Sequence, residues 1–359
     1  MNKKPVIVFD VTSSKRGGPY VACKNIMSSS LNDEFEFREI TYNNKLGRFI
    51  SWRRIKDLKR QIEEINPDGI IINGLQLSCF HVCVAALLAK VKTRIITIHG
   101  SSIEALCLSR FKKSILYIIE YLSLMMSTSF YGVSKYASTL SASKFFRSKN
   151  CGHVYNLTTK PVKTPGLISR QSLRFEPTDI IVASSGRVIK EKGFEVLAKA
   201  VKAIDLPHVK FIILGDGDYL NEFKESLSTE VNAGRVVCTG FTSNVYDYLE
   251  ISDIFVLPTL HETLSVSLLE ASYARLPLVS CNVGGVPEVI ESGYNGILVE
   301  PGNVEETAKA IIELATNKSV RHEMGANAEI RLRKFFSSQD SLEKLSKLIK
   351  SDLNRWKKD

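Results

Sequence analysis

The sequence predicts an α/β protein of two domains, each a parallel sheet with helices wound on both faces. The length of 359 residues favours two domains, because a typical domain has roughly 100–200 residues. Short, β-branched apolar runs alternate with helix-like stretches along the chain, which is typical of doubly wound sheets. These runs are continuously apolar rather than alternating in polarity, and this pattern indicates strands that are buried on both faces.

The expected strands fall into two series. In the first half of the chain they lie at residues 6–9, 70–72, 94–98, 130–133 and 154–155. In the second half they lie at residues 180–184, 209–214, 236–238, 254–257, 278–280 and 297–299. The stretches between the strands are long enough for helices, so each series predicts one doubly wound domain.

The boundary between the two series lies at residues 160–179, which hold three prolines, a glycine and scattered polar residues. Such a composition favours a linker. We therefore expect an N-terminal domain at residues 1–163, a linker at 164–175 and a C-terminal domain at 176–337. The cleft between two such domains is the default ligand site.

The net charge of +10 is unevenly distributed along the chain. Residues 1–165 hold 25 Lys and Arg against 11 Asp and Glu, whereas the remainder holds 23 against 27. An excess on one half indicates an acidic partner, and composition alone leaves open whether this is nucleic acid, phosphates or an anionic membrane surface.

Other features of the sequence indicate the cytosol. Seven cysteines without a CxxC pair favour reduced thiols over a disulfide framework. No apolar run reaches the roughly 20 residues that a membrane-spanning helix needs. The first residues lack the apolar core and cleavage site of a signal peptide, so none is expected.

The sharpest chemical signal is a pair of glutamates, Glu262 and Glu270, which follow the expected strand at residues 254–257. Being eight residues apart, they lie on about the same side of a helix, two turns from one another. Both can face a ligand at the N-terminus of that helix, where unpaired N–H groups attract hydroxyls and anions. A bare pair of glutamates is more often two solvated side chains, so the flanking motifs decide.

These motifs occur in both halves of the chain. The second half contains Gly186-Arg187 followed by Lys192-Gly193, Gly215-Asp216-Gly217, Arg275-Leu276-Pro277, Gly284-Gly285-Val286-Pro287-Glu288 and Gly293-Tyr294-Asn295-Gly296. The first half contains Gly17-Gly18, Ile98-His99-Gly100, Val133-Ser134-Lys135-Tyr136 and Val154-Tyr155-Asn156. Together they closely resemble the retaining, nucleotide-sugar-dependent glycosyltransferases of family 4, most strongly over residues 180–315.

The resemblance implies the GT-B fold, in which two Rossmann-like domains face each other across a cleft. The N-terminal domain would bind the acceptor and the C-terminal domain the nucleotide sugar. In this fold the last helix often crosses back to the first domain. We therefore expect the amphipathic C-terminal helix, at about residues 338–359, to pack on the N-terminal domain.

The resemblance also implies roles for the charged residues of the second half. Glu270 would bind the ribose of the nucleotide, and a fixed carboxylate is a natural acceptor for two vicinal hydroxyls. Glu262 would lie near the donor sugar. Arg187 and Lys192 would hold the donor diphosphate and neutralise it as the glycosidic bond breaks.

Further site residues follow from the same resemblance. Gly17 and Gly18 match a loop whose backbone approaches the phosphates, which residues without a Cβ permit. His99 matches a catalytic histidine near the sugar, where a hydrogen-bond donor would orient the sugar or stabilise its developing charge. Gly240 and Phe241 lie where the family binds the base, mostly through its backbone.

The loop after Glu262 departs from the family pattern. Thr263 and Ser265 replace glycines, and with Leu264 they complete the expected donor-binding set. Their side chains are expected to narrow the pocket or to add hydroxyls, so the identity of the donor sugar stays open. The segment Asp216-Gly217-Asp218 looks like a metal-binding D-x-D motif, but its position after a strand favours a turn.

The resemblance implies retention of the anomeric configuration by a front-face path. The leaving phosphate would take the proton of the acceptor hydroxyl on the same side of an oxocarbenium-like centre. We expect no metal and no cofactor, because no cluster has metal-ligand spacing and the nucleotide sugar is a substrate.

Two basic, amphipathic segments of the first half indicate the acceptor side. Residues 48–60 carry six cations among apolar and aromatic residues, and they favour a membrane or a phosphate surface. Residues 110–126 begin with cations and continue as an apolar helix, for which a buried helix is an equally good interpretation.

The expected function is transfer of a sugar from a UDP- or GDP-linked donor to a lipid-linked oligosaccharide. The expected pathway is synthesis of lipopolysaccharide O-antigen, capsule or exopolysaccharide, and the expected location is the cytoplasmic face of the membrane. A nucleotide-sugar epimerase of the same fold is one alternative. A basic nucleic-acid-binding protein is another, although no nucleic-acid-binding motif is found. A catalytically inactive sugar-binding relative is a third.

Overall fold

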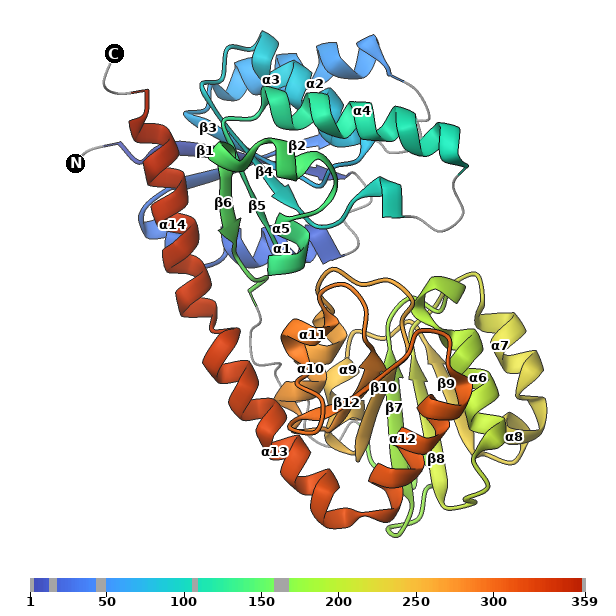
Figure 1. Ribbon diagram of the computed structural model, residues 1–359. Coiled ribbons are helices and arrows are strands. Elements are labelled where there is room, and N and C mark those ends of the chain that lie inside the picture. The colour runs from blue at the N-terminus through green and yellow to red at the C-terminus, as the bar shows by residue number, and fades with distance from the viewer. Residues whose placement is uncertain (1–2, 13–17, 43–49, 105–108, 158–167, 357–359) are drawn as a thin grey trace. The chain divides into compact units, whose positions relative to one another are not determined.

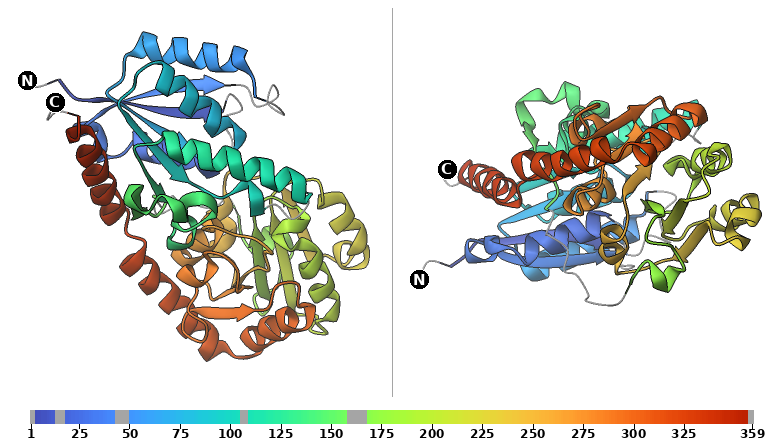
Figure 2. Two further views of the ribbon diagram at one scale, coloured as in Figure 1. Left: turned by 45° about the horizontal axis from the view of Figure 1, so that its top comes forward. Right: turned by 90° about the horizontal axis from the view of Figure 1, so that it is seen from below.

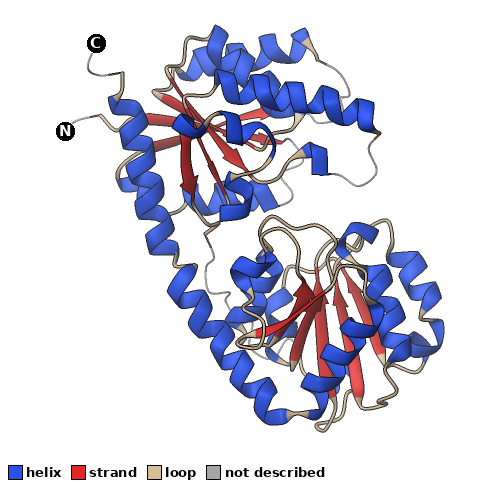
Figure 3. Ribbon diagram, in the orientation of Figure 1, coloured by secondary structure: helices blue, strands red, loops and turns tan. Residues whose placement is uncertain are grey.

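The computed structural model describes residues 3–12, 18–42, 50–104, 109–157 and 168–356. Contacts divide the chain into two compact units, residues 1–157 with 338–359 and residues 158–337. Each unit contains a six-stranded sheet, and every strand pairing among the described residues is parallel. Figure 3 shows both sheets in red with helices in blue around them.

The sheet of the first unit has the strand order β2-β1-β3-β4-β5-β6. Its strands are β1 (Val6–Thr12), β2 (Glu36–Tyr42), β3 (Gly69–Asn73), β4 (Thr93–Ile98), β5 (Ser129–Gly132) and β6 (Asn150–His153). The chain steps from β1 to β2 in one direction and from β3 to β6 in the other. The order therefore reverses between β1 and β3, and in open α/β sheets ligands bind beyond the carboxyl ends of the strands at such a point.

The helices of the first unit are α1 (Gly18–Met27), α2 (Trp52–Ile65), α3 (Leu77–Leu88), α4 (Arg110–Met126), α5 (Lys135–Ser138) and α14 (Ser338–Asn354). In Figures 1 and 2 α2, α3 and α4 lie together on one side of the sheet. On the other side Leu345 and Ile349 of α14 join Phe9 of β1 and Cys23 of α1 in one core cluster. The C-terminal helix thus completes the core of the first unit.

The sheet of the second unit has the strand order β12-β11-β10-β7-β8-β9. Its strands are β7 (Ile180–Ser185), β8 (Val209–Leu214), β9 (Val236–Gly240), β10 (Ile254–Leu257), β11 (Leu278–Cys281) and β12 (Gly296–Val299). Here the chain order reverses between β7 and β10. The loops that follow β7 and β10 are therefore expected to form the ligand site of this unit.

The helices of the second unit are α6 (Phe194–Ala203), α7 (Leu220–Ser226), α8 (Ser228–Asn232), α9 (Val245–Glu250), α10 (Val266–Tyr273), α11 (Val286–Val289), α12 (Val304–Thr316) and α13 (Lys318–Phe335). Its main core packs Phe194 of α6, Phe223 of α7 and Ile311 of α12 against Phe211 of β8. Among the described residues of both units, no helix is both long and apolar enough to cross a membrane.

The structure confirms ten of the eleven expected strands. The strand expected at residues 154–155 is wrong, since β6 ends at His153. Val154 and Tyr155 are buried outside the strand, and their apolar side chains reflect this burial. Strand β2 was not expected because it lies at the edge of the sheet and alternates polar with apolar residues. Part of the expected linker packs into the second unit, where Phe175 is buried and Arg170 pairs with Asp253 at 2.8 Å.

Candidate functional site

Two loops of the second unit meet where its strand order reverses. The loop after β7 carries Arg187 and Lys192, and the loop after β10 carries Glu262. The backbone N–H of Leu260 donates to the carbonyl of Glu191 at 2.9 Å and so joins the two loops directly. Arg187, Lys192 and Glu262 therefore lie at one edge of the sheet, and Glu270 follows in α10.

Two glycines allow the loop after β7 to lie so close to the loops after β10 and β8. Gly193 has φ +76°, and a Cβ there would lie 1.7 Å from the carbonyl oxygen of Pro258, directly after β10. Gly215, after β8, has φ +140°, and its Cβ would lie 1.9 Å from the carbonyl oxygen of Gly186. The neighbouring backbone leaves no room for a side chain at either position, so the shape of the site requires glycine at both.

We expect Gly193→Ala to destabilise the second unit by about 2–5 kcal/mol, because it adds left-handed backbone strain to a clash with Pro258. Gly234→Ala is the matched control. Gly234 has a similar φ of +68°, but nothing lies within 4 Å of its Cβ position, so its replacement is expected to cost only the strain of left-handed backbone, about 1–2 kcal/mol. Chemical denaturation of the two variants measures the difference, and equal losses would contradict the close approach.

The structure brings Lys192 and Glu262 into an ion pair. Lys192 ends the short 3-10 turn η7 (Lys190–Lys192), and Glu262 is 8% exposed. Arg187 is exposed on the same loop, and no described carboxylate pairs with it. The loops thus present one cation that a carboxylate balances and one that is available to an anionic ligand.

Glu270 lies in the second turn of α10 and is half-buried. Burial raises the pKa of its carboxyl to about 7. No described group donates a hydrogen bond to this carboxyl, so nothing in the described structure offsets the loss of water around it. A ligand that brings two hydroxyls would supply the missing donors.

The loop between the two glutamates has a structural reason to lack glycine. The hydroxyl of Ser265 accepts a hydrogen bond from the N–H of Leu268 at 3.4 Å and caps α10. The backbone of Ser265 has φ −82°, an ordinary value for an L-residue. Thr263 and Leu264 are buried beside it. The oxygen of the Ser265 hydroxyl is therefore the N-cap of α10.

The remaining predicted residues of the second unit lie at the ends of β8 and β9. Gly240 ends β9 with φ +71°, and Phe241 beside it is 84% exposed. Asp216 accepts from the N–H of Gly217 at 2.8 Å, and its carbonyl accepts from Val188 at 3.0 Å. The segment Asp216-Gly217-Asp218 is thus a turn that supports the loop after β7.

In the first unit His99 follows β4 and lines a small pocket with Asn73, Thr97 and Tyr131. Its Nε2 lies 3.2 Å from Oδ1 of Asn73. Burial lowers the pKa of His99 to about 4, so the ring is neutral at physiological pH. Gly18 begins α1, whereas Gly17 lies outside the described residues.

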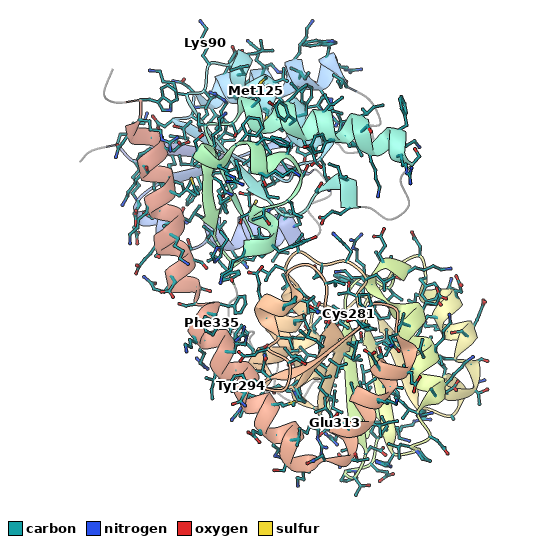
Figure 4. The ribbon with its side chains drawn as sticks, viewed as in Figure 1. Lys90, Met125, Cys281, Tyr294, Glu313 and Phe335 are labelled. Atoms are coloured by element: carbon teal, nitrogen blue, oxygen red, sulfur yellow. The ribbon has the colours of Figure 1, made fainter. Side chains whose placement is uncertain are left out.

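The two basic segments of the first unit differ in what they expose. Helix α2 buries the apolar residues Ile55, Leu58 and Ile62 in the core, while residues 48 and 49 lie outside the described part. Helix α4 leaves a row of apolar side chains exposed, namely Phe111, Ile115, Ile118 and Met125. Met125 is labelled in Figure 4. The first basic segment exposes Ile50 and Trp52 at the start of α2, so α4 has the longer exposed apolar row of the two.

Two further residues, Asp10 and Asn73, are not predicted by the sequence motifs. The side chain of Asn73 contacts both Asp10 and His99. Each comes directly after an apolar run, at residues 6–9 and 70–72. A polar residue at the buried end of an expected strand is the pattern that could have identified them as site residues. Among the described residues, no group of three or more His, Cys, Asp or Glu side chains is arranged to hold a metal ion.

The family described as "Glycosyl transferases group 1" matches residues 167–331, which include both loops and both glutamates. Residues 167–331 of the second unit are thus similar to the glycosyl transferase group 1 family. The matched region contains Arg187, Lys192, Glu262 and Glu270.

Two similar curated proteins are bacterial glycosyltransferases. The capsular polysaccharide biosynthesis glycosyltransferase CapM of Staphylococcus aureus is 24% identical over 344 residues, which cover 87% of each chain. The UDP-Gal:alpha-D-GlcNAc-diphosphoundecaprenol alpha-1,3-galactosyltransferase of Escherichia coli is 25% identical over 193 residues. That match covers 52% of this chain and only half of the length of the E. coli enzyme.

Among solved structures, HepE of Anabaena in complex with UDP and glucose superposes with a TM-score of 0.79 at 19% identity. The superposition covers 96% of this chain and 99% of HepE. Two parallel six-stranded sheets with this helix arrangement are the GT-B fold, so the predicted fold class is confirmed.

Proposed function

We propose that this chain transfers a hexose from a UDP-hexose to a lipid-linked oligosaccharide, with retention of the anomeric configuration. The observation that carries the proposal is the joined pair of loops in the region similar to the group 1 family. They hold two cations and the carboxylate of Glu262 at the point where the strand order of the sheet reverses, and Glu270 follows in α10. A nucleotide sugar offers a matching set of groups, namely a diphosphate, a ribose diol and the hydroxyls of a hexose.

In this proposal Arg187 and Lys192 bind the diphosphate. The ion pair of Lys192 with Glu262 holds the ammonium group in place before the donor arrives. Ionised Glu270 accepts hydrogen bonds from the two ribose hydroxyls, which fill its lack of donors. Glu262 is paired with Lys192 and so lies beside the proposed diphosphate site. We therefore assign it to the sugar, which is attached to the diphosphate.

The choice of uridine comes from the relatives rather than from the site. The E. coli relative is named for UDP-Gal, and the HepE structure contains UDP. Gly240 and the exposed Phe241 are the residues we assign to the base. Neither carries a hydrogen-bonding side chain, so GDP-linked donors are the competing outcome.

The proposed reaction needs no metal ion. The bond between the anomeric carbon and the β-phosphate oxygen breaks, and the two cations stabilise the charge on the departing diphosphate. The acceptor oxygen bonds to the same face of the sugar and passes its proton to the leaving phosphate oxygen. Retention follows because both events take place on one face.

We assign the acceptor side to the first unit, which carries the excess positive charge. The exposed row on α4 is flanked by cations at the start of that helix, and Phe145 (61% exposed) lies near it, with its ring 6.2 Å from that of Tyr121. Apolar side chains among Lys and Arg fit an anionic bilayer, in which lipid-linked sugars reside. The enzyme would then act at the cytoplasmic face, in synthesis of O-antigen, capsule or exopolysaccharide.

Flotation with vesicles tests this surface. The wild-type chain is expected to float with vesicles of phosphatidylglycerol and phosphatidylethanolamine at low salt, because apolar insertion and cation attraction act together. Replacing Ile115 and Ile118 with Glu should abolish flotation, since each places a charge in the apolar row. Ile330→Glu, at an equally exposed residue of α13 (54%), is the control and should float as the wild type does. Flotation of the double variant would contradict the assignment.

A thermal-shift panel tests the donor. Uridine, guanosine, adenosine and thymidine diphosphates are compared, since a ligand at 100 times its Kd adds about 2.7 kcal/mol of stability. UDP is expected to raise the melting temperature most. If no nucleoside diphosphate shifts it, the proposed donor site is wrong.

A further inference from the structure

Helix α4 changes its surroundings at Glu120. Residues 110–118, the first half of the helix, include none that is buried, and the first buried residues are Ile119 and Glu120. Figure 1 shows this first half of α4 extending beyond the strands of the sheet. Glu120 therefore lies where the exposed half of the helix joins the body of the first unit.

The carboxyl group of Glu120 holds two other segments of the first unit. Glu120 is 0% exposed, and its Oε1 and Oε2 accept from the hydroxyl of Ser101 at 2.8 Å and 3.0 Å. Its Oε2 also accepts from the hydroxyl of Ser141. Ser101 lies in the loop after β4, and Ser141 begins the 3-10 turn η4 (Ser141–Phe145), which follows α5. One buried side chain thus joins α4 to two separate parts of the chain.

The backbone of Ser141 supports the importance of this contact. Its φ is +53°, a left-handed conformation that an L-residue adopts only where its surroundings hold it. The hydrogen bond to Glu120 is one of the contacts that hold it. The start of η4 therefore depends on Glu120 for its position.

The loop after β4 is fixed at both ends of its described part. Ser101 is bound to Glu120, and Glu104 accepts from the hydroxyl of Tyr136 on α5. His99 stands two residues before Ser101. The loop begins at the carboxyl end of β4, at the edge where open α/β sheets bind their ligands. A residue that fixes this loop therefore fixes the border of the ligand edge of the first unit.

The outer face of the same helical turn carries the exposed apolar row. Ile118, which is 57% exposed, comes two residues before Glu120. Successive residues turn by about 100° around a helix, so these two side chains point to nearly opposite faces. The turn of α4 that exposes the row is thus also the turn that holds the loop after β4.

We infer that Glu120 is a positioning residue for the acceptor, which ties the loop after β4 to the membrane-facing helix α4. The reactive hydroxyl of a lipid-linked acceptor is then presented in one position relative to the bilayer. This assignment rests on the proposed function, in which α4 meets the bilayer and the first unit binds the acceptor. Being fully buried, Glu120 acts through Ser101 and Ser141. A buried carboxyl adds little net stability over an apolar residue of similar volume, which favours a role in geometry.

Hydrogen exchange of the free protein tests the tie without any substrate. In Glu120→Ala the amides of residues 100–104 should exchange about 10-fold faster, among them that of Ile103, which donates to Oγ of Ser101 at 3.2 Å. Residues 139–145 should respond in the same way. Glu120→Gln should restore slow exchange, since an amide oxygen in the place of Oε2 can accept from both serines.

Ser123→Ala is the matched control for Glu120→Ala. Ser123 is equally buried on α4, but its hydroxyl donates to the carbonyl of Ile119 in the same helix at 2.8 Å. Its replacement should leave exchange in both segments unchanged. Unchanged exchange of residues 100–104 in Glu120→Ala would overturn the inference.

Two serine variants keep the test local if Glu120→Ala loosens the whole unit. Ser101→Ala and Ser141→Ala each remove one arm of the contact and leave α4 as it is. Ser101→Ala should speed exchange in residues 100–104, and Ser141→Ala in residues 139–145. If neither serine variant changes its own segment, Glu120 is a packing residue and the inference is wrong.

Transfer kinetics test the consequence for the reaction. With vesicles that contain the lipid-linked acceptor, Glu120→Ala should lower kcat/KM for the acceptor about 10- to 100-fold, since a misplacement of about 1 Å can cost about 100-fold. The KM for UDP-hexose and the flotation with vesicles should stay as in the wild type, because the donor residues lie in the second unit and the apolar row faces outward. A wild type that neither binds UDP nor transfers sugar refutes the proposed function. A wild type that transfers sugar beside an unimpaired Glu120→Ala variant refutes this inference alone.

Discussion

Replacing Lys192 with Met is expected to lower kcat for sugar transfer about 100- to 1000-fold, and Arg187→Met should have an effect of similar size. Both side chains stabilise charge that grows on the leaving diphosphate, so their loss raises the barrier more than it weakens binding of the intact donor. Release of UDP from UDP-hexose in the presence of a lipid acceptor measures kcat and KM separately.

Lys190→Met is the matched control for Lys192→Met. Lys190 lies on the same turn, but it points to the surface, where it pairs with Glu222 at 3.3 Å, and its side chain is 60% exposed. Its replacement should leave kcat within about twofold of the wild type. An equal loss in the Lys190 and Lys192 variants would mean that general charge, rather than a diphosphate contact, supports the reaction.

Glu270→Gln is expected to lower the affinity for UDP about 10- to 100-fold and, at the same time, to stabilise the free protein at alkaline pH. A hydrogen bond to a charged group is worth about 1.5–3 kcal/mol, which accounts for the loss of affinity. The gain in stability has the opposite origin, since Gln removes a half-buried carboxylate that has no donor.

The pH dependence of this gain has a definite sign. The pKa of Glu270 is about 7 in the folded chain, above its ordinary value of 4.5. The folded protein therefore favours the protonated acid, and the wild type loses stability as the pH rises from 4.5 through 7. Glu270→Gln should melt above the wild type at pH 8 but not at pH 4.5.

Calorimetric titration with UDP and thermal melting at the two pH values measure both effects. Glu313→Gln, at an exposed residue of α12 that Figure 4 labels, is the control and should change neither. Undiminished UDP binding by Glu270→Gln would remove Glu270 from the ribose site. A lower melting temperature at pH 8 would mean that the carboxylate has a stabilising partner.

The second unit could be predicted closely from the sequence because its strands are continuously apolar. The runs at residues 209–214 and 254–257 coincide with β8 and β10. Edge strand β2 escaped prediction because solvent on one side gives it a mixed pattern. Residues 154–155 were wrongly predicted as a strand, since a buried segment is apolar whether or not it forms a strand.

The candidate site divides in the same way. Glu262, Glu270, Arg187 and Lys192 carry their signal in local motifs, and their loops lie where a reversal of strand order places them. Asp10 and Asn73 carry no local motif. Their partnership depends on β1 and β3 being neighbours in the sheet, which is a long-range pairing. The exposure of the apolar row on α4 likewise depends on what packs against that helix.

Transfer of labelled sugar to lipid tests the central proposal most directly. The purified chain is mixed with UDP-galactose, UDP-glucose or UDP-N-acetylglucosamine labelled in the sugar, together with an extract containing lipid-linked diphosphate sugars. Label should enter the lipid phase from one UDP-hexose with the wild type and with Lys190→Met, but not with Lys192→Met. Conversion of the nucleotide sugar to its epimer without any acceptor, with no label in lipid, would contradict the proposed transfer.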